Sequence, residues 1–465
     1  MNRSAITRFI SSTLFFLYAF SLAGQDLPFI KATSNSAVVR LNKSSRTNRW
    51  GISPETKPDV YIASCVPGKK TRVTFITDLD SITFNVVVGD SVFFNIILNE
   101  KDTALTCING KAIPEAAVFS KKYIKKSKGL VSVQVPEVKE LLQVIFAITP
   151  TGLADVKSFI INHDTTAYYL KVIDHFLLFK NEPVVRVMDS LLMKGQYINL
   201  KMDACAFIFT GDNIVFGDTY NRYNNSGSSV NLAEPYIQLL KDFAVKTSFR
   251  KFYAGNKPYY DSLIQVYQKW VPVRKMWQWC EQQFPSRYQS YRVYFSPLVK
   301  GNHATSHAEN NGFKETNMFI RPALALPQVN EKVREALNSR IVFTEIDHNY
   351  VNPETDRYLQ RVNRIFNKRN IWADGKESNG YSDPYNLFNE YMTWALYVLY
   401  CREIYAPEDF KFVQDNTANY LIKIRGFPKF MEFTDALLSL YSTRPAGMTV
   451  AGLYPQLLDW CEKQN

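Results

Sequence analysis

Glu345 and His348 stand three positions apart in a segment whose spacing suits metal chemistry. On a helix, two histidines four positions apart face the same way and together bind Zn²⁺, while a glutamate directly after the first histidine activates the metal-bound water. Glu345 and His348 match the glutamate and the second histidine of this pattern, but Thr344 stands where the first histidine belongs. The segment therefore predicts a general base, Glu345, and one ligand, His348, with the other helical ligand missing.

Glu390 is the candidate for a further ligand. It lies in an apolar run that is predicted to be the next long helix, over residues 384–404. A lone charge in such a run is costly unless it is paired or bound to a metal. Upstream, residues 317–321 are expected to form the edge strand along which an extended substrate would align.

His303 and His307 are the pair that remains to complete the ligand set. If their segment is helical, the two imidazoles form a ligand pair of their own. In a loop, one of them would join His348 and Glu390, and neutral imidazole with carboxylate suits Zn²⁺. The alternative interpretation is a polar loop with solvent-facing histidines.

The elements that must position these residues differ between the two ends of the chain. β-Branched and aromatic runs alternate over residues 72–77, 81–88 and 91–98, which is typical of short strands. From about residue 135 the period lengthens to that of helices, interrupted by a hairpin over residues 206–216 and by strands at 291–295 and 317–321. The stretch from residue 331 to 351 is predicted to be the helix that carries Glu345 and His348.

These patterns predict an α+β protein with a signal peptide and two domains. Residues 25–120 are expected to form a small antiparallel β-sandwich or barrel, and residues 121–465 a mainly helical domain with a small sheet. Residues 1–24 combine Arg3 and Arg8 with an apolar stretch and small residues, which is the pattern of a secretory signal. We therefore expect export to the periplasm, the cell surface or the medium.

Composition excludes several classes of protein. The chain has a formal charge of +12, but its basic residues are dispersed, and it carries no zinc-finger, RNA-binding or basic-zipper pattern. Nucleic acid is therefore not an expected partner. After the signal no segment is apolar for long enough to predict a membrane span.

The C-terminal two-thirds of the chain resembles a family of secreted bacterial proteins of unknown function, whose helix carries a zincin-like His-Glu-x-x-His followed by a Val-Asn-Pro step. The N-terminal part is similar to an accessory β-domain found on exported bacterial hydrolases. The first resemblance rests on Glu345, His348, Val351-Asn352-Pro353 and residues 389–391, and the second on residues 50–52, 57–60, 73–78 and 80–84. Together they imply a peptidase-like, zincin-like fold for the helical domain.

Two functions follow as hypotheses. In the first, the protein is an exported zinc-dependent peptidase or amidase, in which His348 and Glu390, with His303 or His307, hold Zn²⁺ and Glu345 is the general base. In the second, the threonine at position 344 leaves an inactive domain whose cleft binds an extended peptide, a glycan or a protein partner.

Overall fold

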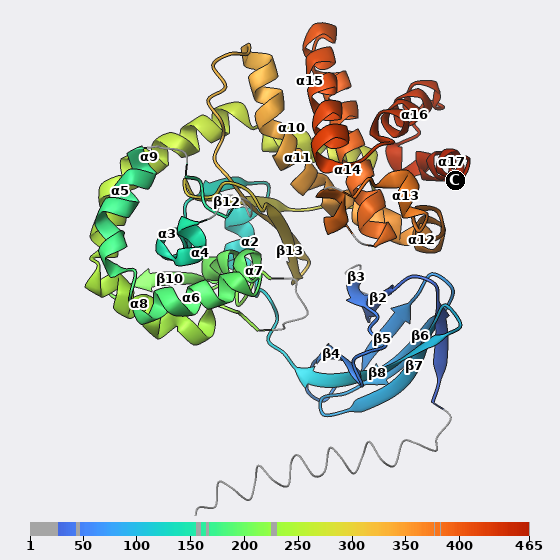
Figure 1. Cartoon of the computed structure of the whole chain (residues 1–465), viewed down its shortest axis with the longest axis horizontal. Coiled ribbons are helices and arrows are strands. Elements are labelled where there is room, and N and C mark those ends of the chain that lie inside the picture. Colours follow the sequence, from blue (N-terminus) through green and yellow to red (C-terminus); the bar gives the residue numbers. More distant parts are fainter. Residues whose placement is uncertain are drawn as a thin grey trace, which may run out of the picture. The chain divides into compact units, whose positions relative to one another are not determined.

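The computed structural model describes residues 27–42, 47–154, 160–163, 167–224, 230–375, 377–381 and 383–464. The predicted signal, residues 1–24, lies outside them. The chain divides between Ala112 and Ile113 into two compact units (Figure 1). Strands build the first unit and mostly helices the second, so the protein is of the α+β class.

The first unit consists of two four-stranded sheets, with strand orders β1-β7-β8-β4 and β3-β2-β5-β6. The strands are β1 (Phe29–Ala32), β2 (Ser36–Leu41), β3 (Thr47–Gly51), β4 (Asp59–Cys65), β5 (Thr71–Ile76), β6 (Ser81–Val86), β7 (Ser91–Leu98) and β8 (Asp102–Ala112). The expectation of a wholly antiparallel module is wrong, because β1 pairs with β7, and β4 with β8, in parallel. Alternating residues determine which face of a strand is buried, but they carry no information on the direction of its neighbour.

The two sheets share one core. In β4, every second side chain from Asp59 to Cys65 is buried, as expected for a strand with one face turned to a core. Phe75 of β5 is fully buried and packs edge-on against Tyr61 of β4 and Phe94 of β7, with ring centroids 5.4 and 5.0 Å away. Phe75 therefore joins one sheet to the other.

The second unit is organised around a sheet with the strand order β13-β14-β12-β9. Its strands are β9 (Val131–Gln134), β12 (Ser290–Phe295), β13 (Ala304–Asn310) and β14 (Phe313–Ile320). The strands β9, β12 and β14 are parallel, and β13 is antiparallel to β14. The prediction that residues 317–321 form the edge strand is wrong, because β14 lies inside the sheet. The edge strand on this side of the sheet is β13, which begins directly after His303.

Helices surround this sheet. The first group is α2 (Lys121–Ser127), α3 (Glu137–Ile148), α4 (Pro150–Leu153), α5 (Ala167–Phe176), α6 (Pro183–Met193), α7 (Tyr197–Asp203), α8 (Ile237–Lys246), α9 (Phe249–Trp270) and α10 (Val273–Gln283), with a hairpin of β10 (Phe207–Thr210) and β11 (Asn213–Phe216). The second group is α11 (Glu331–Thr355), α12 (Leu359–Phe366), α13 (Arg369–Trp372), α14 (Pro384–Ile404), α15 (Pro407–Asn419), α16 (Phe430–Thr443) and α17 (Val450–Glu462). No helix in the described part of the chain is both long and apolar enough to cross a membrane.

The long helices α11 and α14 pack against each other in opposite directions. The Tyr397 hydroxyl of α14 donates to the Ala336 carbonyl near the start of α11, and the Tyr385 hydroxyl donates to the Asn352 carbonyl near its end. Side-chain caps start both helices, at Asn330 for α11 and at Asp383 for α14.

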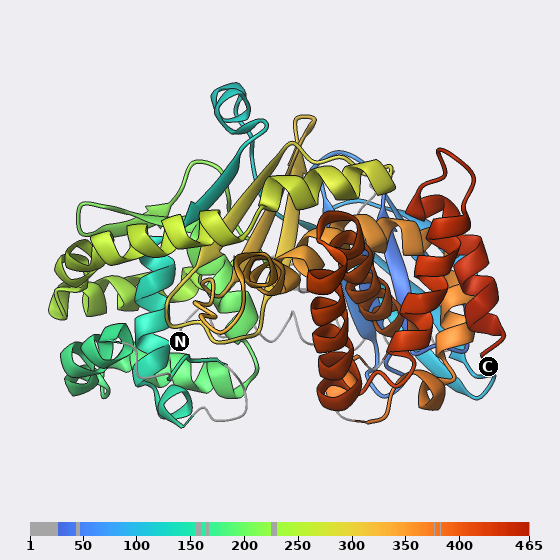
Figure 2. The ribbon, with the colours of Figure 1, turned by 90° about the horizontal axis from the view of Figure 1, so that it is seen from above.

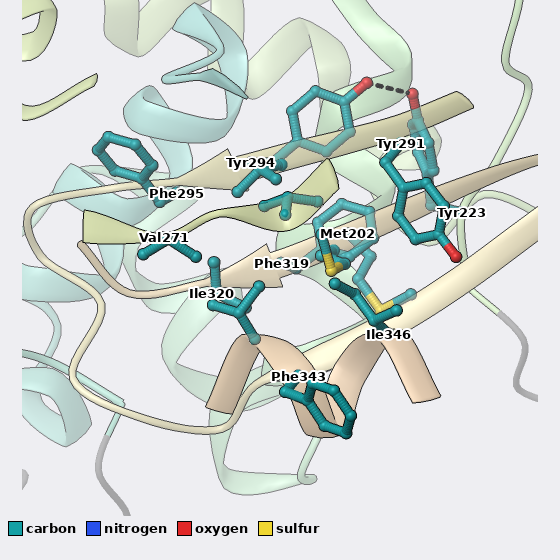
Figure 3. Packing of buried hydrophobic residues seen from close by; sticks show 14 of the residues in the cluster. Met202, Tyr223, Val271, Tyr291, Tyr294, Phe295, Phe319, Ile320, Phe343 and Ile346 are labelled. Carbon is teal, nitrogen blue, oxygen red and sulfur yellow. Dashed lines mark hydrogen bonds between the residues drawn. The ribbon is translucent and has the colours of Figure 1, made fainter. Parts of the chain in front are cut away.

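The sheet packs on α11 through a continuous apolar core. Figure 3 shows Phe319 and Ile320 of β14 close to Ile346 of α11, and all three belong to one buried cluster. Every residue of α14 from Pro384 to Cys401, Asn386 excepted, is buried. Any charge on that stretch of α14 therefore lies in the interior of the unit.

We expect Phe75→Ala to lower the free energy of unfolding of the first unit by about 3–5 kcal/mol, because it leaves a cavity between the two sheets. Calorimetric unfolding of the full chain measures this. Phe29→Ala is the matched control, since Phe29 is 56% exposed, and it should change stability by less than about 0.5 kcal/mol. Equal effects of the two changes would contradict a core centred on Phe75.

Candidate functional site

The helix α11 presents Glu345 and His348 on one side, because residues three positions apart are neighbours on a helix surface. Both side chains are partly exposed, whereas the residues directly before each of them, Thr344 and Asp347, are buried. The Thr344 hydroxyl donates to the Ile341 carbonyl one turn back, at 2.9 Å. Thr344 thus satisfies its polar group within its own helix, where a histidine would offer a ring nitrogen on the same side as His348.

The structure brings His348 and Glu390 together from the two packed helices. The Nε2 of His348 lies 3.4 Å from Glu390 Oε1, and its Nδ1 lies 3.3 Å from the Asn352 side-chain oxygen. Burial alone would lower the pKa of His348, but the hydrogen bond to Glu390 and the charges of Glu390 and Glu345 outweigh it and raise that pKa. The contact with Glu390 therefore favours the imidazolium form of His348 more than in a free histidine.

The second oxygen of Glu390 has two donors of its own. Its Oε2 accepts from the Trp394 indole and from the Arg425 guanidinium, each at 3.2 Å. Arg425 ends the π-helical turn η6 (Tyr420–Arg425), and it also donates to the Tyr381 hydroxyl. Burial would raise the pKa of Glu390, but His348 and Arg425 more than compensate and lower it. Glu390 is thus an ionised carboxylate held between the His348 imidazole and the Arg425 guanidinium.

Glu345 occupies a different electrostatic environment. Burial and the nearby Glu390 raise its pKa to about 7, against the opposing influence of His348 and Lys201. Lys201, on α7, is itself buried beside Lys139, and this lowers the pKa of Lys201 to about 7 despite the attraction of Glu345. Its ammonium group donates to the Asn302 carbonyl. Glu345 and Lys201 are therefore two interacting groups whose pKa values both lie near neutral pH.

The structure does not bring His303 and His307 together as a ligand pair. His307 lies in the strand β13, and His303 is the residue directly before that strand. Four residues of extended chain span about 13 Å, whereas on a helix the two histidines would be neighbours one turn apart. His307 packs edge-on against the Tyr288 ring, with centroids 6.0 Å apart. The Nδ1 of His303 is buried without a hydrogen-bond partner, and burial together with Lys201 and Arg321 lowers its pKa to about 3. His303 is therefore a neutral imidazole.

The residues at the site do not fit a zinc centre of the expected kind. Such a centre needs three protein ligands and an open position. In the described part of the chain, no three His, Cys, Asp or Glu side chains form a group that could hold a metal ion. Both oxygens of Glu390 are already engaged, one of them by a guanidinium whose charge repels a cation. Zinc therefore stays a prediction from the sequence, and no chemical step is derived through it.

Sequence reasoning missed the groups that accompany His348 and Glu390. Arg425 lies 35 residues after Glu390, and Tyr381, although it shortly precedes Glu390, does not stand in a pattern that indicates a site. Lys201 offered a weak signal, since it is a charge in the apolar run Tyr-Ile-Asn-Leu-Lys-Met. Trp394 could have been found, because it stands one helical turn after Glu390, where the two side chains are neighbours.

We expect Glu390→Gln to lower the pKa of His348, because the carboxylate that favours the imidazolium is replaced by a neutral amide. With only five histidines in the chain, an NMR titration resolves this imidazole. Glu309→Gln, an exposed change on β13, is the control and should leave that pKa unchanged. Because the pKa of His348 is higher in the folded chain than in the unfolded chain, protonation of His348 stabilises the fold. This stabilisation is fully present at pH values below the pKa of an unperturbed histidine, and it is lost as the pH rises through the raised pKa. An unchanged pKa in Glu390→Gln would contradict the ion pair.

Comparison of the chain with models of known protein families, with curated proteins and with solved structures finds no match. The resemblance to a secreted family with a zincin-like helix, and to an accessory β-domain, therefore stays a prediction that rests on the residues given above. The interpretation of the site depends on its geometry alone.

Proposed function

We propose that the second unit is a zincin-like domain that has no metal-dependent catalysis and binds an extended segment of a peptide or protein partner beside Glu345 and His348. One observation carries the proposal: the carboxylate of Glu390 is bound on one side by His348 and on the other by Arg425. The two candidate metal ligands, His348 and Glu390, are thus paired with each other, and Glu390 is also paired with Arg425.

Electrostatics argues against a divalent cation at this place. For a metal to bind, His348 must lose its proton, and Glu390 must exchange the Arg425 guanidinium for the metal or share its charge with both. Two positive groups in a partly buried site repel each other more strongly than they do in water. With threonine at position 344, this cost is not compensated by the second helical imidazole.

The sheet beside α11 supports an extended ligand. β13 is an edge strand, and α11, which carries Glu345 and His348, packs against both β13 and β14. An edge strand offers unpaired backbone groups to an incoming strand, and this is a common way to bind extended peptides. A peptide paired with β13 would extend the sheet beside the helix that holds the polar residues of the site.

A zinc-dependent peptidase is the second candidate, and the meeting of His348 and Glu390 at 3.4 Å favours it. Two ligands of one metal must approach each other in this way, and Glu345, with its pKa near 7, has the character of a general base. This function requires Arg425 to leave Glu390 and a third ligand, such as His303 or His307, to reach the site. For either function we propose an exported protein, in the periplasm, on the cell surface or in the medium.

Metal analysis of the purified full chain by mass spectrometry separates the two candidates. We expect no stoichiometric zinc, nickel or cobalt after equilibration with a small excess of each ion, and the same result for His348→Ala. One equivalent of zinc that is lost in His348→Ala would contradict the proposal and favour the peptidase. One equivalent of zinc that is still bound in His348→Ala would belong to some other site.

The binding function is tested with random peptides displayed on phage and selected on the full chain. We expect the selected peptides to bind about tenfold more weakly to Thr305→Pro, which removes a backbone donor of β13, and equally well to Glu345→Gln. Neither protein should cleave them. Hydrogen exchange over residues 304–310 is a second test that does not depend on how well the variant folds. In the unsubstituted chain, bound peptide should slow exchange over this strand. Unchanged exchange over this strand, or cleavage that Glu345→Gln abolishes, would overturn the assignment.

A further inference from the structure

The opposite edge of the same sheet, β9, is also open. β9 pairs in parallel with β12, with Val131 opposite Tyr291 and Val133 opposite Val293, and the Leu130 carbonyl accepts from the Tyr291 amide at 3.0 Å. In a parallel ladder alternate residues bond to the same neighbour, so the backbone groups of Val131 and Val133 point away from β12. Neither residue has another hydrogen-bond partner in the described part of the chain.

A groove runs along this edge. It has a volume of about 430 Å³, and it lies between β9 and the corner where α9 ends and α10 begins. Such a volume is in the range of ligand sites, about 300–1,000 Å³. The apolar lining comes from Leu130, Val131 and Val133 on the strand and from Val271, Pro272 and Val273 at the corner. Leu130 is 48% exposed, so the groove opens an apolar surface to solvent.

The surroundings of the groove are strongly basic. Figure 2 shows that α2 projects beyond the sheet and that β9 follows it into the sheet. Residues 121–134 contain five lysines and residues 271–280 add two basic residues, and neither stretch contains an acid. The exposed side chains are Lys121, Lys122, Lys125, Lys126, Lys128, Arg274 and Lys275. None forms an ion pair with any residue that the structure describes, although Arg274 donates to the Gly129 carbonyl and thereby joins α10 to the end of α2.

We propose that this groove is a docking site for an extended acidic segment of a partner protein. The backbone of the segment pairs with Val131 and Val133, alternate apolar side chains enter the groove, and the carboxylates between them face the lysines of α2. Because successive side chains of a strand point to opposite faces, a sequence of alternating acidic and β-branched residues can pair with the open edge, fill the apolar groove and face the lysines at the same time.

The chemistry of the groove favours such a segment over a nucleic acid strand. Phosphates would be attracted to the same lysines, but a nucleic acid has no peptide backbone to pair with Val131 and Val133. Proteins that bind single-stranded nucleic acids without sequence preference also use exposed aromatic side chains, on which the bases stack. The single aromatic residue that lines the groove, Tyr267, is buried with only 1% of its side chain exposed.

A fluorescent peptide of about six residues, alternating glutamate and valine, tests the proposal on the full chain. We expect saturable binding by fluorescence polarisation, together with slower hydrogen exchange over residues 129–135 in the bound state. Two comparison peptides separate the contributions: one with lysine in place of each glutamate, and one with the same charge but with proline in place of each valine. Both should bind at least about tenfold more weakly.

The variant Lys125→Glu/Lys126→Glu reverses two exposed charges at the end of α2 and should weaken binding of the acidic peptide by at least about tenfold. The matched control is Lys251→Glu, an exposed change on α9 away from the groove, which should leave the affinity within about twofold. Because these residues are on the surface, neither variant should change the melting temperature by more than a few degrees.

Three results would overturn the proposal: equal binding of the lysine peptide, equal binding of the proline peptide, or unchanged exchange over residues 129–135. Protection of that segment by a short oligothymidine strand, but not by the acidic peptide, would assign the surface to nucleic acid instead. Because β13 and β9 are opposite edges of the sheet, these outcomes are independent of the function proposed for the site beside Glu345.

Discussion

The arrangement of the helical unit depends on how one buried charge is compensated. α14 is buried over most of its length, and it carries Glu390 into the interior, where an isolated carboxylate would be unstable. His348 from α11 and the Arg425 guanidinium from η6 pair with Glu390 and lower its pKa, which favours the ionised carboxylate. Breaking such a buried pair by removing one partner typically costs about 3–5 kcal/mol, because the remaining charge stays in the interior. The positions of α11, α14 and η6 relative to one another are therefore constrained by a single side chain.

This constraint also shapes what the site can do. A metallopeptidase keeps its ligands free of competing cations and leaves an open coordination position, whereas here Glu390 is already engaged by His348 and Arg425. Glu345 forms no ion pair with a residue that the structure describes, and its pKa near 7 allows it to accept or donate a hydrogen bond according to protonation state. Such a group suits recognition of a peptide backbone, which offers both a donor and an acceptor in every residue.

Local pattern explains what could be predicted from the sequence. The strand over residues 91–98, the hairpin around Gly211 and the helix over residues 384–404 coincide with β7, β10–β11 and α14, because each has a clear period and a recognisable boundary. The pairing of His348 with Glu390 follows from their places on two long helices. Arg425 and Lys201 could not be predicted, because tertiary packing alone brings them to the site. The segment of His303 and His307 was ambiguous, because polar residues flank both histidines and no apolar period distinguishes a strand from a helix or a loop.

The two edges of the central sheet pose the same physical problem, since open edges attract other strands, including those of identical chains. At β9, the lysines of α2 repel a second copy of this basic surface, and by the same charge they attract an acidic segment. Protection against self-association therefore accounts for the charge, but not for the apolar groove beside the strand. An edge that only had to be kept from pairing would gain nothing from leaving Leu130 exposed to water beside that groove, since exposed apolar area is unfavourable. The coincidence of groove, open edge and unpaired lysines is what a selective docking surface requires.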